Sequence, residues 1–216
     1  MDFRDTPEEA AFRAEVRAWL EANGQKRTRP DEVFGEGLDD AAKLAAAKAW
    51  QAKKAAAGYA AITWPKAAGG RGGTAMQQVI YQQEEAAYLV PGMIFEVSIG
   101  MGLPTVMTWA APELKARFLR PGLAGEEIWC QLFSEPGAGS DLASLSTKAE
   151  KVDGGWKITG QEIWTTVAQF SDWAMLSRLR YTSAIFSLQR YMSKQSPFLC
   201  FSSNCFSCRN LRSDWA

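Results

Sequence analysis

A run of small and hydroxyl residues between positions 131 and 141 has the composition of a ligand-binding loop. The segment reads Gln-Leu-Phe-Ser-Glu-Pro-Gly-Ala-Gly-Ser-Asp, so a short apolar stretch ends in a serine and continues into glycines. With no bulky side chains in the way, backbone N–H groups of such a loop can approach an anion or a planar ring. An ordinary turn after a strand has the same composition, so this run alone does not separate binding from connection.

A second stretch, residues 160–166, places a large aromatic beside two hydroxyls. Trp164 is followed by Thr165 and Thr166 at the expected end of a strand. An indole offers a face for stacking, and threonine hydroxyls donate and accept hydrogen bonds. Taken by itself, this stretch is also typical of a core residue followed by a turn.

The chain has no histidine, which excludes a Ser-His-Asp triad, a Cys-His pair and any histidine-ligated metal. Its cysteines are Cys130, Cys200, Cys205 and Cys208, and the Cys205-x-x-Cys208 pair has no second pair or histidine to complete a zinc site. Chemistry must therefore come from carboxylates, hydroxyls, lysines, a thiol or a bound cofactor.

The elements that position these stretches change from helices to strands along the chain. Thr6 before Pro7 predicts a helix start, and Thr74 with Gln77 predicts a capping box. Trp19 and Trp50 fall at helical spacing and are interpreted as core residues. The run Gly69–Gly73 is interpreted as a flexible connector. Helices are predicted near residues 7–23, 39–57, 74–89, 93–107 and 112–119.

From residue 126 the pattern favours short strands with tight turns, typical of an antiparallel sheet or barrel. A hairpin turn is predicted at Asp153-Gly154-Gly155. The last 36 residues contain one acidic residue and show neither helical nor strand periodicity, which favours a frameshifted or read-through terminus. Strands are predicted at 128–134, 146–152, 156–159, 162–165 and 172–179. The predicted domains are 1–122 (helical), 123–180 (partial β-barrel) and 181–216 (atypical tail, disordered or out of frame).

Charge and hydropathy narrow the class of protein. Lys plus Arg and Asp plus Glu both total 24, which gives no support for a nucleic-acid partner or a polybasic membrane patch. No signal-like segment and no apolar run long enough to insert into a membrane is visible. A cytoplasmic protein is the expectation.

The two stretches, taken together with their order and spacing, closely resemble the acyl-CoA dehydrogenase family, particularly bacterial members that act on bulky acyl-CoAs. The resemblance runs from about residue 2 to residue 179. It implies an α+β fold in which an all-helical N-terminal domain precedes an antiparallel β-barrel. The blocks that carry it are, in chain order, Trp64-Pro65-Lys66, Gly69–Gly73, Gln83-Glu84-Glu85, Ser134–Asp141, Thr147–Glu150, Ile158–Gln161 and Ile163–Thr165.

The resemblance also implies an FAD site. The strand Gln131–Ser134 would lie along the isoalloxazine ring, with Ser134 bonded to its pyrimidine end and Leu132 and Phe133 giving backbone and apolar contact. Gly139 and Ser140 would meet the diphosphate, and Ser140 would also lie near the acyl-CoA substrate. Trp164 would pack on the ring and Thr166 would donate near N5. The implied cofactor-binding residues are Gln131, Leu132, Phe133, Ser134, Gly139, Ser140, Trp164, Thr165 and Thr166.

The family reaction implied is α,β-dehydrogenation of an acyl-CoA thioester to a 2-enoyl-CoA, in β-oxidation of fatty acids or steroid side chains. Electrons leave through an electron-transfer flavoprotein, and family members form homo- or hetero-oligomers. The family's base lies in a C-terminal helical domain, for which this chain has no matching segment. Glu135 and Glu162 belong to the binding motifs, so no catalytic residue is assigned to the chain.

Two other functional hypotheses remain. One is a non-catalytic subunit that binds flavin or acyl-CoA and serves assembly, and the other is a plain structural domain. If a covering domain is missing, apolar surface is expected around Phe133, Trp164 and Trp173.

Overall fold

A computed structural model describes residues 4–92, 94–152, 155–176, 184–187 and 205–213 of the chain. The chain forms two compact units, which divide after Glu126. The first comprises residues up to 99 together with 103–126, and the second comprises residues 100–102 and those from 127 onward.

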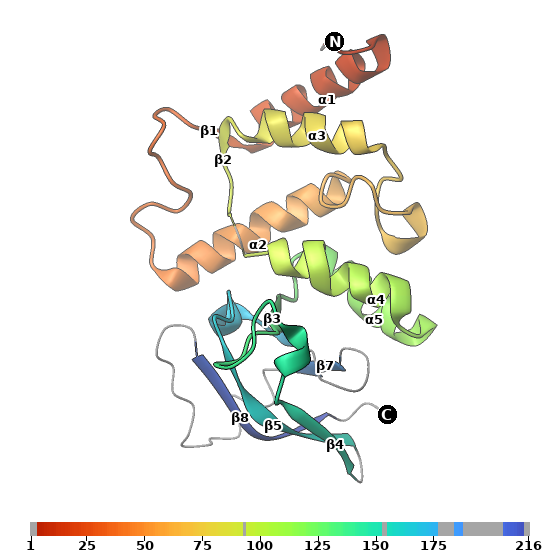
Figure 1. Cartoon of the computed structure of the whole chain (residues 1–216). Helices are drawn as coiled ribbons and strands as arrows, with labels where there is room; N and C mark the ends of the chain where they lie inside the picture. The colour runs from red at the N-terminus through yellow and green to blue at the C-terminus, as the bar shows by residue number, and fades with distance from the viewer. Residues whose placement is uncertain (1–3, 93, 153–154, 177–183, 188–204, 214–216) are drawn as a thin grey trace. The chain divides into compact units, whose positions relative to one another are not determined.

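The first unit is helical, as predicted (Figure 1). Helix α1 has Thr6 as its N-cap and Pro7 in its first turn, and Glu9 completes a capping box. Helix α5 likewise starts on a proline, Pro112. The elements of this unit are α1 (Pro7–Asn23), β1 (Gln25–Lys26), α2 (Asp40–Ala56), η1 (Lys66–Ala68), α3 (Ala75–Glu85), β2 (Tyr88–Leu89), α4 (Leu103–Trp109) and α5 (Pro112–Leu123), with the π-helical turn η2 (Ser98–Gly102) leading into α4.

The core of the helical unit forms between α1, α2 and α3. Val16 and Leu20 of α1 and Ile80 of α3 are fully buried, and α1 and α3 lie side by side in Figure 1. Trp50 of α2 is buried beside them, and Trp19 packs on it with ring centroids 5.5 Å apart. The prediction that both tryptophans serve core packing is therefore confirmed.

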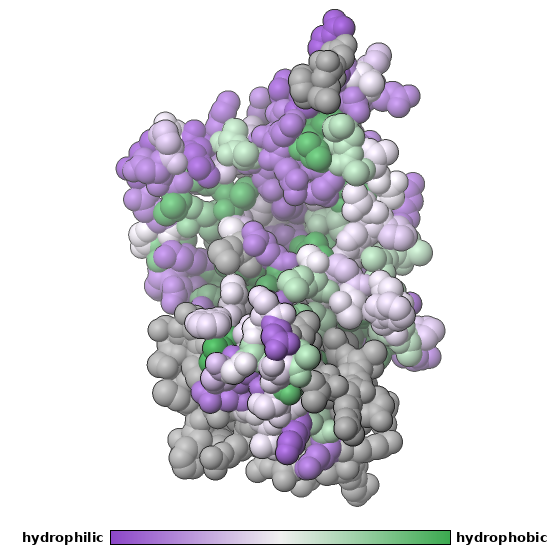
Figure 2. Space-filling model, in the orientation of Figure 1, coloured by the Kyte–Doolittle hydropathy of each residue, from purple (hydrophilic) through white to green (hydrophobic). Residues whose placement is uncertain are grey.

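Charged side chains reinforce the same pair of helices from outside. Arg13 donates to Glu84 at 2.8 Å and to Asp5 at 2.6 Å, and Arg17 donates to Glu84 at 2.7 Å. Polar residues accordingly cover much of the face of this unit seen in Figure 2, with apolar residues scattered among them.

The capping box of α3 gives a test of local stability. Thr74 Oγ1 accepts from the Gln77 amide at 3.1 Å, and Gln77 Oε1 accepts from the Thr74 amide at 3.0 Å, as predicted. Thr74→Ala removes the first bond and is expected to lower the free energy of unfolding by about 1 kcal/mol in urea titrations. Thr74→Ser keeps the hydroxyl and is the matched control; an equal loss in both variants would contradict the capping role.

The glycine-rich run Gly69–Gly73 is not the flexible connector that its composition predicted. All five of its amides donate to carbonyls of the preceding segment, for example Gly70 to Pro65 at 3.1 Å, Gly72 to Trp64 at 2.8 Å and Gly73 to Ile62 at 2.8 Å. A Cβ on Gly70 would lie 2.3 Å from the Trp64 carbonyl oxygen. The glycines therefore permit close backbone packing, and these amides are already engaged rather than open to a phosphate.

The second unit contains two three-stranded sheets, and Figure 1 shows β4, β5 and β8 of one of them as neighbours. In one, β6 lies between β3 and β7, and in the other β5 lies between β4 and β8. The described strands do not close into a barrel, so the barrel stays a prediction. The elements are β3 (Trp129–Leu132), η3 (Leu142–Ser144), β4 (Lys148–Val152), β5 (Gly155–Ile163), η4 (Ala168–Phe170), β6 (Trp173–Leu176), β7 (Ala184–Ser187) and β8 (Cys205–Ser213).

Strand pairing follows the prediction in one sheet and departs from it in the other. β4 and β5 pair antiparallel as expected, with Val152 opposite Gly155, while the turn residues 153–154 lie outside the described residues. β3 and β6 are parallel, so the predicted antiparallel pairing is wrong there. The reason is that the β4–β5 hairpin lies between them in the chain and serves as the crossover that parallel strands require.

Strands also occur where the sequence predicted a tail without regular structure. Ala184–Ser187 pairs with β6 and Cys205–Ser213 pairs with β5, both antiparallel. An open strand edge offers unpaired N–H and C=O groups that any backbone can join, whatever its side-chain periodicity. Composition alone could not predict this pairing.

Candidate flavin-facing site

The two stretches singled out in the sequence lie directly beside each other in the second unit. The Ile163 amide donates to the Ser134 carbonyl at 2.7 Å, so the last residue of β5 contacts the chain two residues after the end of β3. The ends of the segments 131–134 and 162–166 are therefore joined through their backbones. This contact is the condition on which the predicted site depended.

The loop after Ser134 is a tight turn whose backbone faces outward. Glu135 and Ala138 exchange two backbone hydrogen bonds of 2.8 and 3.1 Å. An added Cβ on Gly137 or Gly139 would meet no described atom within 4 Å, and Ser140 is exposed. The loop thus offers open main chain, as a bound anion or ring requires.

Glu135 ties this loop to the start of β4. Its carboxylate is 3% exposed and accepts from the Ser146 amide at 2.8 Å, from the Thr147 amide at 2.7 Å and from the Ser146 hydroxyl. Although burial opposes it, these donors hold the pKa of Glu135 below its ordinary value. The carboxylate is fully engaged and therefore structural.

Trp164 stands out on this surface. Its side chain is 68% exposed, and its backbone has a φ of +52°, a left-handed conformation that is uncommon for a bulky residue. A strained backbone that presents an indole to solvent is typical of a site built to contact something. Of the other residues expected to expose apolar surface, Phe133 is half-buried, and the expectation is wrong for Trp173, which is buried against Trp129 with ring centroids 6.2 Å apart.

Polar atoms without partners lie next to these segments. Within the described part of the chain, Gln131 Oε1 and Thr165 Oγ1 are buried and have no hydrogen-bond partner. Such atoms are costly unless a ligand or water satisfies them. Thr166 and Ser134 are half-buried beside them.

The side chain of Leu132 does not face this surface. It is 1% exposed and packs with Cys130, Ala174 and Leu176 in the core of the unit. Side chains alternate along a strand, so when Leu132 points inward, Gln131 and Phe133 point the other way. Only the backbone of Leu132 is available to a ligand on this surface, which corrects the predicted apolar contact.

Glu162, Thr147 and Gly160 support the site, although the sequence did not single them out for this role. Glu162 is 1% exposed and accepts from Thr147 Oγ1 at 3.1 Å. Burial raises its pKa to about 7, and the nearby charge of Glu135 acts in the same direction. The signal available in the sequence was Gly160, because a glycine inside a strand often marks close packing.

The described residues give no support for a reactive cysteine or a metal site. Burial raises the pKa of the Cys130 thiol to about 12, so this cysteine is unreactive at neutral pH. Across the described residues, no group of His, Cys, Asp and Glu side chains has the arrangement of a metal site. The side chains of Cys205 and Cys208 lie outside the described part.

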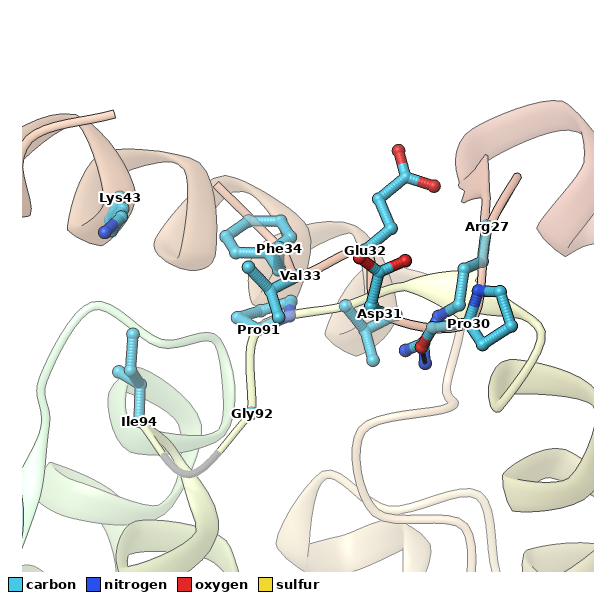
Figure 3. Close-up of a pocket in the computed structure, with 11 residues that line it drawn as sticks. Arg27, Pro30, Asp31, Glu32, Val33, Phe34, Lys43, Pro91, Gly92 and Ile94 are labelled. Carbon is cyan, nitrogen blue, oxygen red and sulfur yellow. Dashed lines mark hydrogen bonds between the residues drawn. The ribbon is translucent and has the colours of Figure 1, made fainter. Parts of the chain in front are cut away.

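A separate cavity of about 450 Å³ lies in the helical unit (Figure 3). Figure 3 shows Val33, Phe34 and Pro91 together at its centre, with Lys43 of α2 on one side and Arg27 on the other. Its lining includes none of the predicted site residues.

Comparison with known proteins identifies the family. Residues 6–126 match the acyl-CoA dehydrogenase N-terminal domain. The chain belongs to the acyl-CoA dehydrogenase family. The resemblance drawn from the sequence motifs is thereby confirmed.

Characterised relatives of this acyl-CoA dehydrogenase chain come from Mycobacterium tuberculosis. It is 35% identical to the acyl-CoA dehydrogenase IpdE1 over 165 residues, covering 76% of this chain and 43% of IpdE1. It is 41% identical to the acyl-CoA dehydrogenase FadE34 over 170 residues, covering 74% of this chain and 23% of FadE34. The chain thus spans less than half the length of these relatives.

Among solved structures, the fold is similar to the ChsE4–ChsE5 complex from Mycobacterium tuberculosis. The TM-score is 0.68 at 29% identity, covering 87% of this chain and 48% of the matched chain. Helices long and apolar enough to cross a membrane are absent from the described residues of this family member.

Proposed function

We propose that this chain forms one wall of an FAD site used in the α,β-dehydrogenation of acyl-CoA thioesters. The observation that carries the proposal is the Ile163–Ser134 hydrogen bond. It brings the loop that follows Ser134 (residues 135–141) next to the segment that contains Trp164. Family membership supports the reaction class.

The residues present fit a flavin. The exposed indole of Trp164 offers a face for stacking on the ring. Gln131 Oε1 and Thr165 Oγ1 have no hydrogen-bond partner and could bond to polar groups of the flavin. Ser134 and Thr166 would hydrogen-bond the polar edges of the ring. Gly139 and Ser140 would meet the diphosphate through open backbone, with Ser140 also near the acyl-CoA. Bound FAD supplies the acceptor for the hydride that leaves the β-carbon.

We do not propose either buried carboxylate as the base that removes the α-proton of the substrate. Glu135 accepts from three donors, and Glu162 is 1% exposed, so neither side chain is accessible to a substrate in this structure. What the chain contributes is orientation and polarity around the ring. Electrons would pass on to an electron-transfer flavoprotein, and the chain would act within a homo- or hetero-oligomer.

Replacing Trp164 tests the proposal directly. Trp164→Ala is expected to weaken FAD binding by about tenfold or more, because the stacking face is lost, while stability is unchanged because the side chain is largely exposed. Binding is measured by quenching of flavin fluorescence and stability by thermal unfolding. Trp109→Ala, which removes an 80%-exposed tryptophan of the helical unit, is the matched control.

Equal FAD affinity in wild type and Trp164→Ala, or no binding by the folded wild-type chain, would refute the proposed site. A second candidate is a flavin- or acyl-CoA-binding subunit without turnover, which is favoured by the structural roles of both buried carboxylates. Acyl-CoA-dependent bleaching of bound flavin with an artificial electron acceptor separates the two. Bleaching by this chain alone would favour the enzyme, and FAD binding without bleaching would favour the subunit.

A further inference from the structure

Two buried carboxylates meet at a single threonine behind the proposed flavin surface. The Thr147 amide donates to Glu135 Oε1 at 2.7 Å, and the Thr147 hydroxyl donates to Glu162 Oε1 at 3.1 Å. Glu135, Thr147 and Glu162 are each less than 5% exposed. Water therefore does little to screen one carboxylate from the other.

The two carboxylates differ in the donors that they receive. Glu135 accepts three hydrogen bonds, from Ser146 and Thr147, and these stabilise its charged form. Among the described residues, Glu162 has one donor, and its Oε2 has no partner. Of the two carboxylates, Glu162 is therefore the one that keeps a proton near neutral pH, in line with its pKa near 7 and the lowered pKa of Glu135.

The pair flanks the contact that holds the site together. Glu135 follows Ser134, and Glu162 precedes Ile163, so each carboxylate is one residue from the Ile163–Ser134 hydrogen bond. Ionisation of Glu162 gives each of the two segments that this bond joins a buried negative charge. Buried like charges repel strongly, and separating the two segments relieves the repulsion.

Among the side chains that the structure describes, Glu135 is the charged group that acts on Glu162. The side chains of β8 lie outside that part. On β4, Lys148 and Glu150 are exposed, whereas the Thr147 that precedes them is buried. On β8, the register places Phe206 opposite Glu162, and Arg209 is opposite Thr159.

We propose that a proton on Glu162 couples the two flavin-facing segments, so that the chain binds FAD when Glu162 is protonated and releases it as Glu162 ionises. The inference rests on the proposed function. Glu162 is a positioning residue that acts through Thr147 and the Ile163–Ser134 contact. Because the chain has no histidine, few side chains compete with it in the neutral pH range.

The test is the pH dependence of FAD affinity in the full chain, measured by quenching of flavin fluorescence between pH 5.5 and 8.5. With a pKa near 7, the fraction of chains in which Glu162 is protonated falls about tenfold between pH 6 and pH 8. Because only these chains are expected to bind FAD, the Kd for FAD should rise by the same factor. Glu162→Gln is neutral at every pH and is expected to show a flat profile. Glu150→Gln removes an exposed carboxylate and should keep the wild-type profile.

The outcomes separate this inference from the proposed function. A flat wild-type profile, or an unchanged slope in Glu162→Gln, overturns the coupling and leaves the flavin site intact. Absence of FAD binding by folded wild type at every pH overturns the flavin site and the coupling with it. If Glu162→Gln does not fold, Glu162→Met is the alternative neutral variant. The pH profile of the wild type tests the coupling in either case.

Discussion

Replacing Gly160 with alanine is expected to reduce the free energy of unfolding of the strand unit by about 3–5 kcal/mol. A Cβ on Gly160 would lie 2.0 Å from Thr147 Oγ1 and 2.8 Å from Thr147 Cβ, so Thr147 must move. Its hydrogen bond to Glu162 is then lost, which leaves a buried carboxyl without its donor. The overpacking and the unpaired carboxyl add to give the estimate.

Hydrogen exchange of β4 and β5 amides, followed across a urea series, measures this effect in the strands themselves. Gly137→Ala is the matched control, because no described atom lies within 4 Å of the added methyl group. Its stability should stay within about 0.5 kcal/mol of wild type. If Gly160→Ala were equally mild, the Thr147–Glu162 arrangement would not be a tight contact.

Local chemistry explains why the helical part was predictable. Thr6 and Thr74 form capping boxes, and Pro7 and Pro112 start helices, all of which depend on residues within four positions of each other. The parallel pairing of β3 and β6 depends on residues some 40 positions apart, and it was missed. Periodicity reports which face of an element is apolar but not which strand it joins.

The sequence predicted which segments form the candidate site, but not which way their side chains point. The motifs located the residues on either side of the Ile163–Ser134 contact, but the inward side chain of Leu132 follows from the alternation of β3 in the fold. In the same way, the sequence placed Glu162 in a binding motif but did not indicate that its side chain is buried next to Thr147. Its burial beside Glu135 arises only when β4 and β5 pair and bring Thr147 between them.

Glu135→Gln is expected to lower the free energy of unfolding by about 3–5 kcal/mol at neutral pH. An amide presents one acceptor oxygen where the carboxylate has two, and its NH₂ group would face the donors of Ser146 or Thr147. Ser146→Ala removes only the hydroxyl donor and should cost about 1 kcal/mol. A stable Glu135→Gln chain that lost turnover instead would contradict the structural role.

The free energy of unfolding, measured in urea at several pH values, should depend on pH differently for Glu135 and for Glu162. The pKa of Glu135 is lowered by folding, so its contribution is present above its ordinary value of 4.5 and is lost as the pH falls. The deficit of Glu135→Gln should therefore shrink in acid. The pKa of Glu162 is raised to about 7, so its contribution is present below 4.5 and is lost as the pH rises toward 7. Glu162→Gln should accordingly gain on wild type over that range. Because the two slopes have opposite signs, a shared slope would contradict the opposite pKa shifts of the two carboxylates.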